Sequence, residues 1–290
     1  MAVITIDPKL ARKLTPPRVS SSKKGDNGIV LVAGGSRFYH GAPVLTSIAA
    51  LRSGADLVYT AVPRSIITPV RSFSPNIIAL PLPDDKLTVG SANRLAAMIP
   101  KRPNTAAIGM GMSIATPEAI IALVNKLKQS ETKILLDASA LIPEILPEIK
   151  GLGAVVTPHD GEYTRLFQSE PGNTEKERVA NVASMAKEHG VTVLLKGPVD
   201  VVSDGRQTGV NKTHNCAMTV GGTGDVLSGI TASFMTRMRP FEAALLGTHL
   251  NGLAGNLTYK RVGLHMAATD LIDSLPAAMK PFDKIKSAAP

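Results

Sequence analysis

A glycine-rich stretch, residues 220–225 (VGGTGD), is the part of the sequence best suited to chemistry. Glycine lets the backbone approach a ligand closely, and the apolar pattern that follows predicts that a helix begins here. The first amides of a helix have no partner within it, so Gly222, Thr223 and Gly224 could bind a phosphate group. Asp225 could accept the proton of a hydroxyl during phosphoryl transfer, or could serve only to complement the helix dipole.

A second group of useful side chains lies at residues 157–162 (TPHDGE), directly after an apolar run. His159 could donate a hydrogen bond to a polar substrate, and Glu162 could hold the water shell of Mg²⁺. The alternative is that this segment simply begins a helix, whose dipole would favour its acidic residues. No paired His or Cys at ligand spacing accompanies it, which disfavours zinc.

Other apolar runs are followed by single polar residues or by glycines. Lys196 could contact a nucleotide phosphate or could simply be solvated, and Asp137 could be a ligand group or a loop cap. Glycine-rich turns at residues 34–35 and 109–111 occupy positions where open α/β sheets bind ligands. We expect Cys216 to be a small buried residue rather than a nucleophile.

The elements that must position these residues alternate short apolar runs with helical patterns, a rhythm typical of a parallel sheet covered by helices. The apolar runs lack a period-two alternation, as expected of strands buried on both faces. We predict strands over residues 29–33, 57–62, 106–108, 134–136, 154–156 and 193–195, helices over 42–52, 117–128 and 175–189, and a hairpin over 199–210. From residue 223 the pattern is strongly helical, through Phe234 and then from Phe241 to Tyr259.

Composition bounds the class of protein. The chain has 290 residues, of which 44% are hydrophobic and 19% charged, values that exclude a disordered or collagen-like protein. No repeat or linker divides it, so we predict a single domain over residues 1–290. The sequence shows neither a secretory signal nor an apolar run long enough to span a membrane, and its one cysteine excludes an intramolecular disulfide. We therefore expect a cytoplasmic protein.

The net charge of +9 is concentrated at the two ends of the chain. Residues 1–26 carry +4 and residues 280–290 carry +2, which leaves +3 for everything between. We interpret residues 1–24 as a basic N-terminal arm and 277–290 as a C-terminal tail, either solvated or able to bind phosphate. A nucleic-acid-binding protein without catalytic activity is disfavoured, because only 3% of the residues are aromatic and could stack on bases.

Taken in order, the motifs resemble those of the NAD(P)H-hydrate dehydratases, ribokinase-like enzymes that repair hydrated nicotinamide cofactors. The resemblance covers roughly residues 20–275. It rests on KG at 24–25, GGS at 34–36, YHGAP at 39–43, ALRSGA at 50–55, GMG at 109–111, LDASAL at 136–141, TPHDGE at 157–162, LKG at 195–197 and GTGDVLSGI at 222–230. Each motif alone is modest evidence for the resemblance, but the occurrence of all of them in this order is specific to the family.

The resemblance implies a three-layer α/β/α sandwich with a mostly parallel central sheet and an edge hairpin. It also implies the ADP-dependent dehydration of (6S)-NADHX or NADPHX to NADH or NADPH, with release of AMP and phosphate. Many relatives carry an epimerase domain ahead of this one, for which 290 residues leave no room, so any epimerase would be a separate partner. Relatives form homo-oligomers, and we expect the same here.

The resemblance also assigns roles to single residues. Ala42, Gly111, His159 and Asp225 would bind the hydrate, and Asp225 would be the catalytic residue at its hydroxyl. The residues that would hold ADP are Lys196, Gly197, Pro198, Val199, Asp200 and Gly224, with the amides of Gly222 and Thr223 at the transferred phosphate. Glu162 stands where related kinases keep the glutamate that organises Mg²⁺.

One alternative enzyme shares this fold. It is an ATP-dependent kinase of a small alcohol, a thiazole or a hydroxymethylpyrimidine. Those relatives often have Cys after Gly-Thr-Gly, where this chain has Asp225. The sequence leaves open the choice between ADP and ATP and between NADHX and NADPHX.

Overall fold

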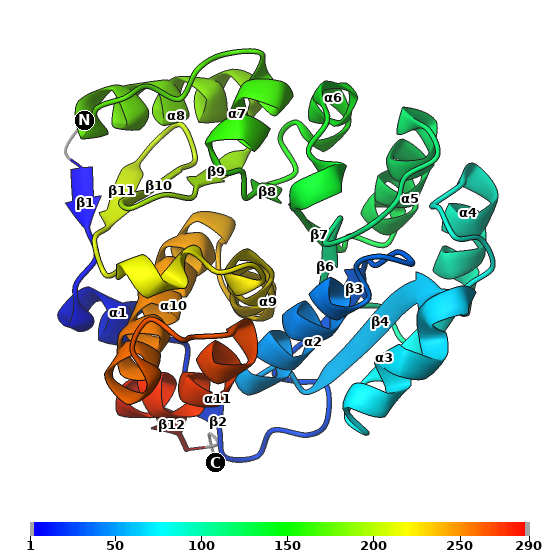
Figure 1. Cartoon of the computed structure of the whole chain (residues 1–290), viewed down its shortest axis with the longest axis horizontal. Coiled ribbons are helices and arrows are strands. Elements are labelled where there is room, and N and C mark those ends of the chain that lie inside the picture. The colour runs from blue at the N-terminus through cyan, green and yellow to red at the C-terminus, as the bar shows by residue number, and fades with distance from the viewer. Residues whose placement is uncertain (1–2, 288–290) are drawn as a thin grey trace.

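A ten-stranded sheet with helices on both faces organises the chain in the computed structural model, which describes residues 3–287 (Figure 1). The strand order is β1-β11-β10-β9-β8-β7-β6-β3-β4-β5, and β2 pairs with β12 in a separate small sheet. Every pairing in the large sheet is parallel except the two that β10 makes. The sheet is therefore mostly parallel, as predicted.

The described strands are β1 (Val3–Thr5), β2 (Arg18–Val19), β3 (Ile29–Ala33), β4 (Leu57–Pro63), β5 (Ile78–Leu82), β6 (Thr105–Ile108), β7 (Lys133–Leu136), β8 (Val155–Val156), β9 (Thr192–Leu195), β10 (Asp200–Ser203), β11 (Thr208–Asn211) and β12 (Ile285–Lys286). The described α-helices are α1 (Pro8–Leu14), α2 (Gly41–Arg52), α3 (Ile67–Phe73), α4 (Val89–Met98), α5 (Pro117–Gln129), α6 (Leu146–Ile149), α7 (Asp160–Phe167), α8 (Glu175–His189), α9 (Thr223–Met235), α10 (Pro240–Val262) and α11 (Ala268–Met279).

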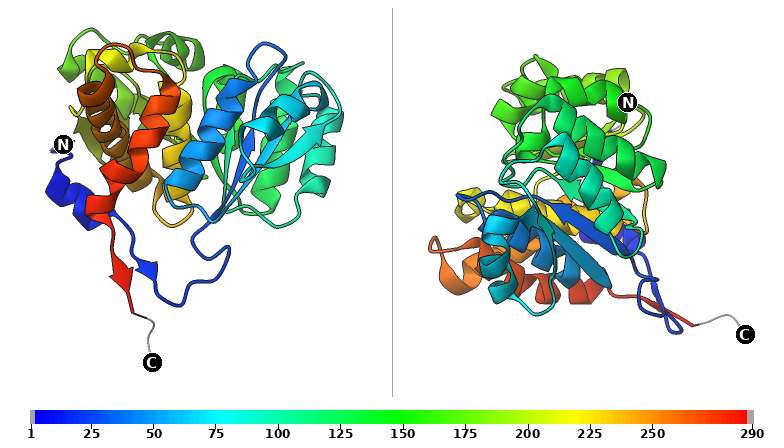
Figure 2. Two further views of the ribbon diagram at one scale, coloured as in Figure 1. Left: turned by 60° about the horizontal axis from the view of Figure 1, so that its bottom comes forward. Right: turned by 90° about the vertical axis from the view of Figure 1, so that its right-hand side faces the viewer.

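The central strands are buried on both faces, which explains their continuous apolar character. In β3 the side chains of Ile29 and Leu31 join a core cluster with α4, α5, α7 and α8, whereas Val30 and Val32 join a second cluster with α2, α9, α10 and α11. Figure 2 shows the resulting layers from two further sides. The predicted three-layer α/β/α architecture is confirmed.

The predicted elements agree closely with those observed. All six predicted strands are present, with ends within one residue of the prediction, and the helices predicted at 42–52, 117–128 and 175–189 correspond to α2, α5 and α8. The hairpin is formed by β10 and β11, and β1 adds a further strand outside it. Helix α9 begins at Thr223, so the glycine-rich stretch does lead into a helix.

Part of the N-terminal segment packs on the body, whereas residues 18–21 and most of residues 280–287 are exposed. Residues Val3–Thr5 pair with β11, and the Asp7 carboxylate accepts a hydrogen bond from the Leu10 amide (2.7 Å) to begin α1. Ala11 in α1 is fully buried, so the apolar residues among the charges supply the attachment. The predicted arm and tail also include residues 1–2 and 288–290, which lie outside the described residues.

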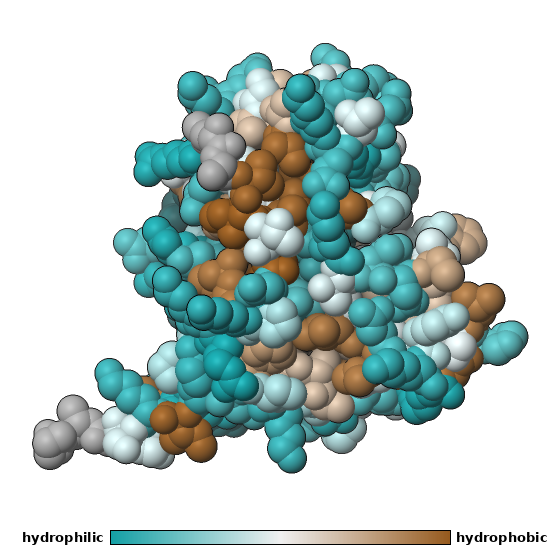
Figure 3. Space-filling view, turned by 90° about the vertical axis from the view of Figure 1, so that its left-hand side faces the viewer, coloured by the Kyte–Doolittle hydropathy of each residue, from teal (hydrophilic) through white to brown (hydrophobic). Residues whose placement is uncertain are grey.

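The pairing of β2 with β12 places residues 18–19 beside residues 285–286. Figure 3 faces the side of the molecule that carries β1 and α1, where apolar side chains gather between charged ones, and the C-terminal segment extends from the lower edge of this view. Over residues 3–287, no helix is long and apolar enough to cross a membrane.

The strand order fixes where a ligand can bind. The chain runs from β3 through β4 to β5 on one side, and then returns to place β6 on the other side of β3. At such a switch the loops after neighbouring strands separate and leave a crevice at the carboxyl ends of the strands. The loops after β3, β6, β7, β8 and β9 all lie at this edge, and they contain or lead directly into most of the predicted site residues, whereas Gly222 to Asp225 come from the segment that joins β11 to α9.

Candidate active site

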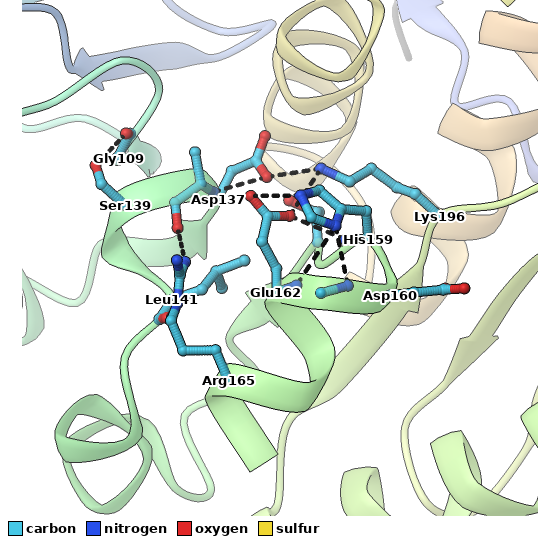
Figure 4. Close-up of polar contacts among 12 residues, drawn as sticks. Gly109, Asp137, Ser139, Leu141, His159, Asp160, Glu162, Arg165 and Lys196 are labelled. Carbon is cyan, nitrogen blue, oxygen red and sulfur yellow. Dashed lines mark hydrogen bonds and ion pairs between the residues drawn. The ribbon is translucent and has the colours of Figure 1, made fainter. Parts of the chain in front are cut away.

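A buried cluster of charged side chains forms where β7, β8 and β9 end. The Lys196 Nζ lies 2.9 Å from the Asp137 Oδ1 and 3.5 Å from the Glu162 Oε2 (Figure 4). The Ser228 hydroxyl, from α9, donates a 2.7 Å hydrogen bond to the other Asp137 oxygen. The cluster thus ties three strand ends to the helix that follows the glycine-rich stretch.

Lys196 is held in its charged form by this cluster. Burial alone would lower the pKa of its ammonium, but Asp137 and Glu162 outweigh burial and raise the pKa above its usual value. Asp137 also accepts a 2.9 Å hydrogen bond from the Ala138 amide, so it is both a loop cap and an ion-pair partner. Lys196 is therefore a fixed positive charge at the strand edge and not a solvated side chain.

His159 and Glu162 form a capping box at the start of α7. The His159 Nδ1 accepts from the amides of Gly161 (3.1 Å) and Glu162 (3.4 Å), and the Glu162 carboxylate accepts from the His159 amide (2.9 Å). The segment does begin a helix, as the alternative held. The His159 side chain remains 61% exposed, so its ring is accessible to a substrate while Glu162 points back to Lys196.

Asp225 lies in the first turn of α9 and has a strongly perturbed acidity. Burial and the neighbouring Asp137 raise the pKa of its carboxyl group to about 7, against a weaker opposing effect of Lys196. Its backbone is fixed from the facing helix: the buried Thr46 hydroxyl donates to the carbonyl oxygens of Asp225 (3.0 Å) and Ala42 (3.1 Å). A carboxyl group with this pKa can accept a proton near neutral pH.

The start of α9 leaves its first amides open. Gly222 precedes the helix with φ 98°, a conformation that favours glycine, and no side chain caps the helix there. The Thr223 hydroxyl donates to the carbonyls of Met218 and Val220, so it does not cover the amides. A Cβ added at Gly224 would lie 3.5 Å from the Lys196 Nζ, which places that charge beside the same turn. This combination suits an anion.

The loops after β3 and β6 meet across the switch of the sheet. The Gly35 amide donates a 2.8 Å hydrogen bond to the Met110 carbonyl, and a Cβ at Gly34 would lie only 2.4 Å from the same oxygen. A Cβ at Gly111 would lie 3.0 Å from that of Ala42. The structure therefore brings together Ala42 and Gly111, two of the predicted substrate-binding residues.

A cavity of about 240 Å³ opens between the end of β9 and the start of α9. Most of the predicted nucleotide-binding residues line it, namely Lys196, Gly197, Pro198, Asp200, Thr223 and Gly224. Two do not: Val199 packs its side chain against the core, and Gly222 lies behind the first turn as the helix cap. The cavity also has walls that the sequence did not reveal, among them Thr213, Thr248, Asn251 and Gly252.

Asp200 and Asn251 place polar side chains in this cavity. Asp200 accepts hydrogen bonds from the Gly197 amide (3.1 Å) and the Asn211 side chain (3.1 Å), and burial raises the pKa of its carboxyl group. Asn251 is 6% exposed, and its buried Oδ1 has no hydrogen-bond partner among the described residues. The sequence around Asn251 contains no motif that marks it as a site residue. Asn251 lies on α10, and only the fold brings it close to the glycine-rich stretch.

The exposure of Cys216 and the arrangement of possible metal ligands can both be compared with the sequence predictions. Cys216 is exposed, which corrects the expectation of a buried residue; it begins a short 3-10 turn before the glycine-rich stretch. Within residues 3–287, no three His, Cys, Asp or Glu side chains are arranged to hold a metal ion on their own. The donors that do lie together, Glu162 and Asp137, suit a hydrated Mg²⁺ that also takes oxygens from a bound phosphate.

The comparison with known proteins agrees with this geometry. The model of a protein family described as NAD(P)H-hydrate dehydratase matches residues 30–277. The chain belongs to the NAD(P)H-hydrate dehydratase family. It is 50% identical to the ADP-dependent (S)-NAD(P)H-hydrate dehydratase of Nitrosopumilus maritimus over 286 residues, which are 98% of this chain and 100% of that protein.

Solved structures of this family and of its wider superfamily share the fold. The ADP/ATP-dependent NAD(P)H-hydrate dehydratase of Bacillus subtilis, co-crystallised with ATP and Mg²⁺, matches with a TM-score of 0.85 and 26% identity over 98% of this chain and 100% of its own. A ribokinase-like superfamily protein of Enterococcus faecalis matches with a TM-score of 0.82 and 22% identity, covering 97% of each chain. The fold is therefore ribokinase-like, as the resemblance implied.

Proposed function

We propose that this chain is a hydro-lyase that uses ADP to dehydrate (6S)-NADHX or NADPHX, yielding NADH or NADPH, AMP and phosphate. The observation that carries the proposal is Asp225, a carboxyl group with a pKa raised to about 7 at the uncapped start of α9. On one side of it lies the cavity that contains Lys196, and on the other lie Ala42 and Gly111. Family membership supports the same activity.

The first step is phosphoryl transfer from ADP to the hydrate. Asp225 accepts the proton of the ring hydroxyl as that oxygen attacks the β-phosphorus, and the bond between that phosphorus and the bridging oxygen breaks to release AMP. The amides of Thr223 and Gly224 and the Lys196 ammonium lie where they can stabilise charge on the transferred group. The hydrogen bond that the Thr46 hydroxyl donates to the Asp225 carbonyl holds this part of the backbone in place during the step.

The second step is elimination of phosphate from the ring. Phosphate is a better leaving group than hydroxide, and the lone pair of the ring nitrogen helps to expel it. Loss of a proton from the adjacent ring carbon then restores the double bond of the dihydronicotinamide. His159 has an exposed ring at the mouth of the site, and we assign it to the binding of the hydrate together with Ala42 and Gly111.

The charges of this site favour a bound Mg²⁺, because its carboxyl groups outnumber its cationic side chains. Three carboxyl groups, Asp137, Glu162 and Asp225, act on the single ammonium of Lys196. Glu162 would hold the hydrated ion, which neutralises charge on the phosphates when bound. The Glu162 carboxylate is already oriented for this by the His159 amide.

The 240 Å³ cavity is the proposed nucleotide site. Lys196 and Gly224 would face the phosphates, and the segment from Gly197 to Asp200 would follow the nucleoside, with the backbone of Val199 taking part. The unpartnered Oδ1 of Asn251 can accept a hydrogen bond from the amino group of adenine. A buried acceptor without a hydrogen bond is unfavourable. A nucleotide whose base donates to the Asn251 Oδ1, as adenine does, would therefore bind more favourably than one whose base does not.

The test is to incubate the enzyme with NADHX, Mg²⁺ and either ADP or ATP, and to follow both the recovery of NADH absorbance and the nucleotide product. The proposal predicts NADH together with AMP and phosphate when ADP is supplied. Accumulation of a stable phosphorylated thiazole or hydroxymethylpyrimidine alcohol, with ATP preferred and no NADH formed, would instead establish the kinase alternative. Homo-oligomeric assembly and a separate epimerase stay predictions.

A further inference from the structure

A second cavity, of about 350 Å³, lies at the opposite end of the sheet from the proposed active site. It is bounded by the end of α2, by the residues after α9 and by the C-terminal segment that leads to β12. In Figure 2 this segment and β2 leave the body at the end away from the loops that follow the strands. Helix α9 has 13 residues, so the two cavities lie roughly 20 Å apart along its axis.

Four cationic side chains line this second cavity, and its only acidic residue among those described is Asp283. The cations are Arg18, Arg52, Arg237 and Lys284. They come from four separate stretches of the chain, so their convergence is produced by the fold and not by a local run of charge. An adjoining cavity of about 290 Å³ shares Arg18 and adds Lys23, Lys24 and the carboxylate of Asp56.

Arg237 contributes a partly buried guanidinium group to this cavity. Its Nε is buried and has no hydrogen-bond acceptor among residues 3–287. A Cβ added at Gly54 would lie 3.4 Å from the Arg237 Nη2 and 3.9 Å from the Arg18 Nη2, so two guanidinium groups converge on one point. Burial and the nearby Arg18 lower the pKa of Arg237, and Asp56 opposes them only in part.

The acidic residues nearby, Asp56 and Asp283, offset only part of the charge of the four cations. Asp56 lies 3.4 Å from the Arg18 Nη2, but its carboxylate already accepts hydrogen bonds from the amides of Gly25 (2.9 Å) and Asn27 (3.0 Å). Arg52 ends α2, where the helix dipole accounts for a part of its favourable placement. That explanation does not extend to the Arg237 Nε, which reaches neither a carbonyl nor a carboxylate.

We propose that this cavity binds a pyrophosphate group, either as the free ion or as part of a small organic diphosphate. The buried Arg237 Nε, which has no partner among the described residues, is a favourable site for a phosphate oxygen, because Arg presents several donors in one plane. Two adjoining cavities that share Arg18 suit two linked phosphates better than one. The apolar side chains of Phe234, Leu250 and Met279 would contact the organic portion of such a ligand.

The test is calorimetric titration of the whole chain at fixed ionic strength with inorganic phosphate, inorganic pyrophosphate and methyl diphosphate. We expect pyrophosphate to bind at least tenfold more tightly than phosphate, and tighter binding of methyl diphosphate would identify the organic form as the ligand. Arg237→Gln should weaken pyrophosphate binding at least tenfold. Arg52→Gln changes an exposed residue and should fold normally. We expect it to weaken pyrophosphate binding by about fivefold, so the test does not depend on whether Arg237→Gln folds.

Two controls separate this site from other sources of binding. Lys196→Met removes the cation of the proposed active site and, at a temperature where its thermal melt shows it to be folded, should leave pyrophosphate affinity unchanged. Lys128→Gln removes an exposed cation from the last turn of α5 and should also have no effect. The proposal is overturned if pyrophosphate does not bind, if both arginine variants bind it as the unchanged chain does, or if either control weakens binding as much as they do.

Discussion

Replacing Asp225 by Asn should remove activity and, at the same time, stabilise the fold at alkaline pH. The folded-state pKa of this carboxyl group is about 7, compared with 3.8 for an ordinary aspartate. Its pKa is raised on folding, so the unfolded chain loses this proton first as the pH rises. Ionisation of Asp225 therefore costs stability, and the cost grows between the two pKa values.

The size of the effect follows from the shift. Three pKa units correspond to about 4 kcal/mol once both states are ionised, and roughly 2 to 3 kcal/mol of this develops between pH 5 and pH 8. Asp225→Asn carries no such charge, so its free energy of unfolding should exceed that of the unchanged chain at pH 8, with a smaller difference at pH 5. Urea denaturation at the two pH values measures this directly, and Asp273→Asn, an exposed carboxylate on α11, is the matched control.

The same carboxyl group governs turnover. The ionised fraction of a group with a pKa of 7 rises from about 9% at pH 6 to about 91% at pH 8, so kcat/KM should rise roughly tenfold over that range. Asp225→Asn should lower kcat by about 10² to 10⁴ and abolish the acidic limb of the profile. A variant that keeps more than about a tenth of the activity, or whose stability at pH 8 is no greater than that of the unchanged chain, would refute the reasoning.

Three further predictions test other parts of the structure. Lys196→Met leaves the buried Asp137 and Glu162 without their cation, so unfolding should become easier by about 3 to 5 kcal/mol in urea and ADP affinity should fall in titration. Gly229→Ala would place a Cβ 2.2 Å from the Thr46 carbonyl and should destabilise the α2 to α9 contact by about 1 to 3 kcal/mol, whereas Gly221→Ala, with no atom within 4 Å, should be neutral in the same thermal melt. Asn251→Leu should raise the KM for ADP roughly tenfold with little change in kcat, as measured in the coupled assay; an unchanged KM would remove Asn251 from nucleotide recognition.

The sequence predicted those strands and helices whose apolar pattern and end signals lie within their own residues. The strands β3 and β9 are uninterrupted apolar runs, and α5 begins with Thr116, Pro117 and Glu118, so each shows its own bounds. Elements at the ends of the chain gave no such signal. Strand β1 is three residues long, and its attachment depends on pairing with β11, more than 200 residues away in the sequence.

The site residues likewise divide into those with a local signal in the sequence and those that depend on distant contacts. Asp225, Lys196, His159 and Glu162 could be predicted because each directly follows a strand or opens a helix at the carboxyl edge of the sheet. Thr46 and Asn251 could not, because each lies within a helix and gains its importance only from a distant element that folds against it. The pKa of Asp225 was equally hidden, since it is set by burial and by Asp137, which is contributed by a different strand.

The exposed Cys216 makes the chain convenient for spectroscopy. It is the single thiol of the sequence, and it lies in the 3-10 turn whose next residues, Met218 and Thr219, line the proposed nucleotide cavity. A maleimide-linked fluorophore would therefore attach at one defined position without any prior mutagenesis. Its emission would report, in real time, when this loop gains or loses a bound nucleotide.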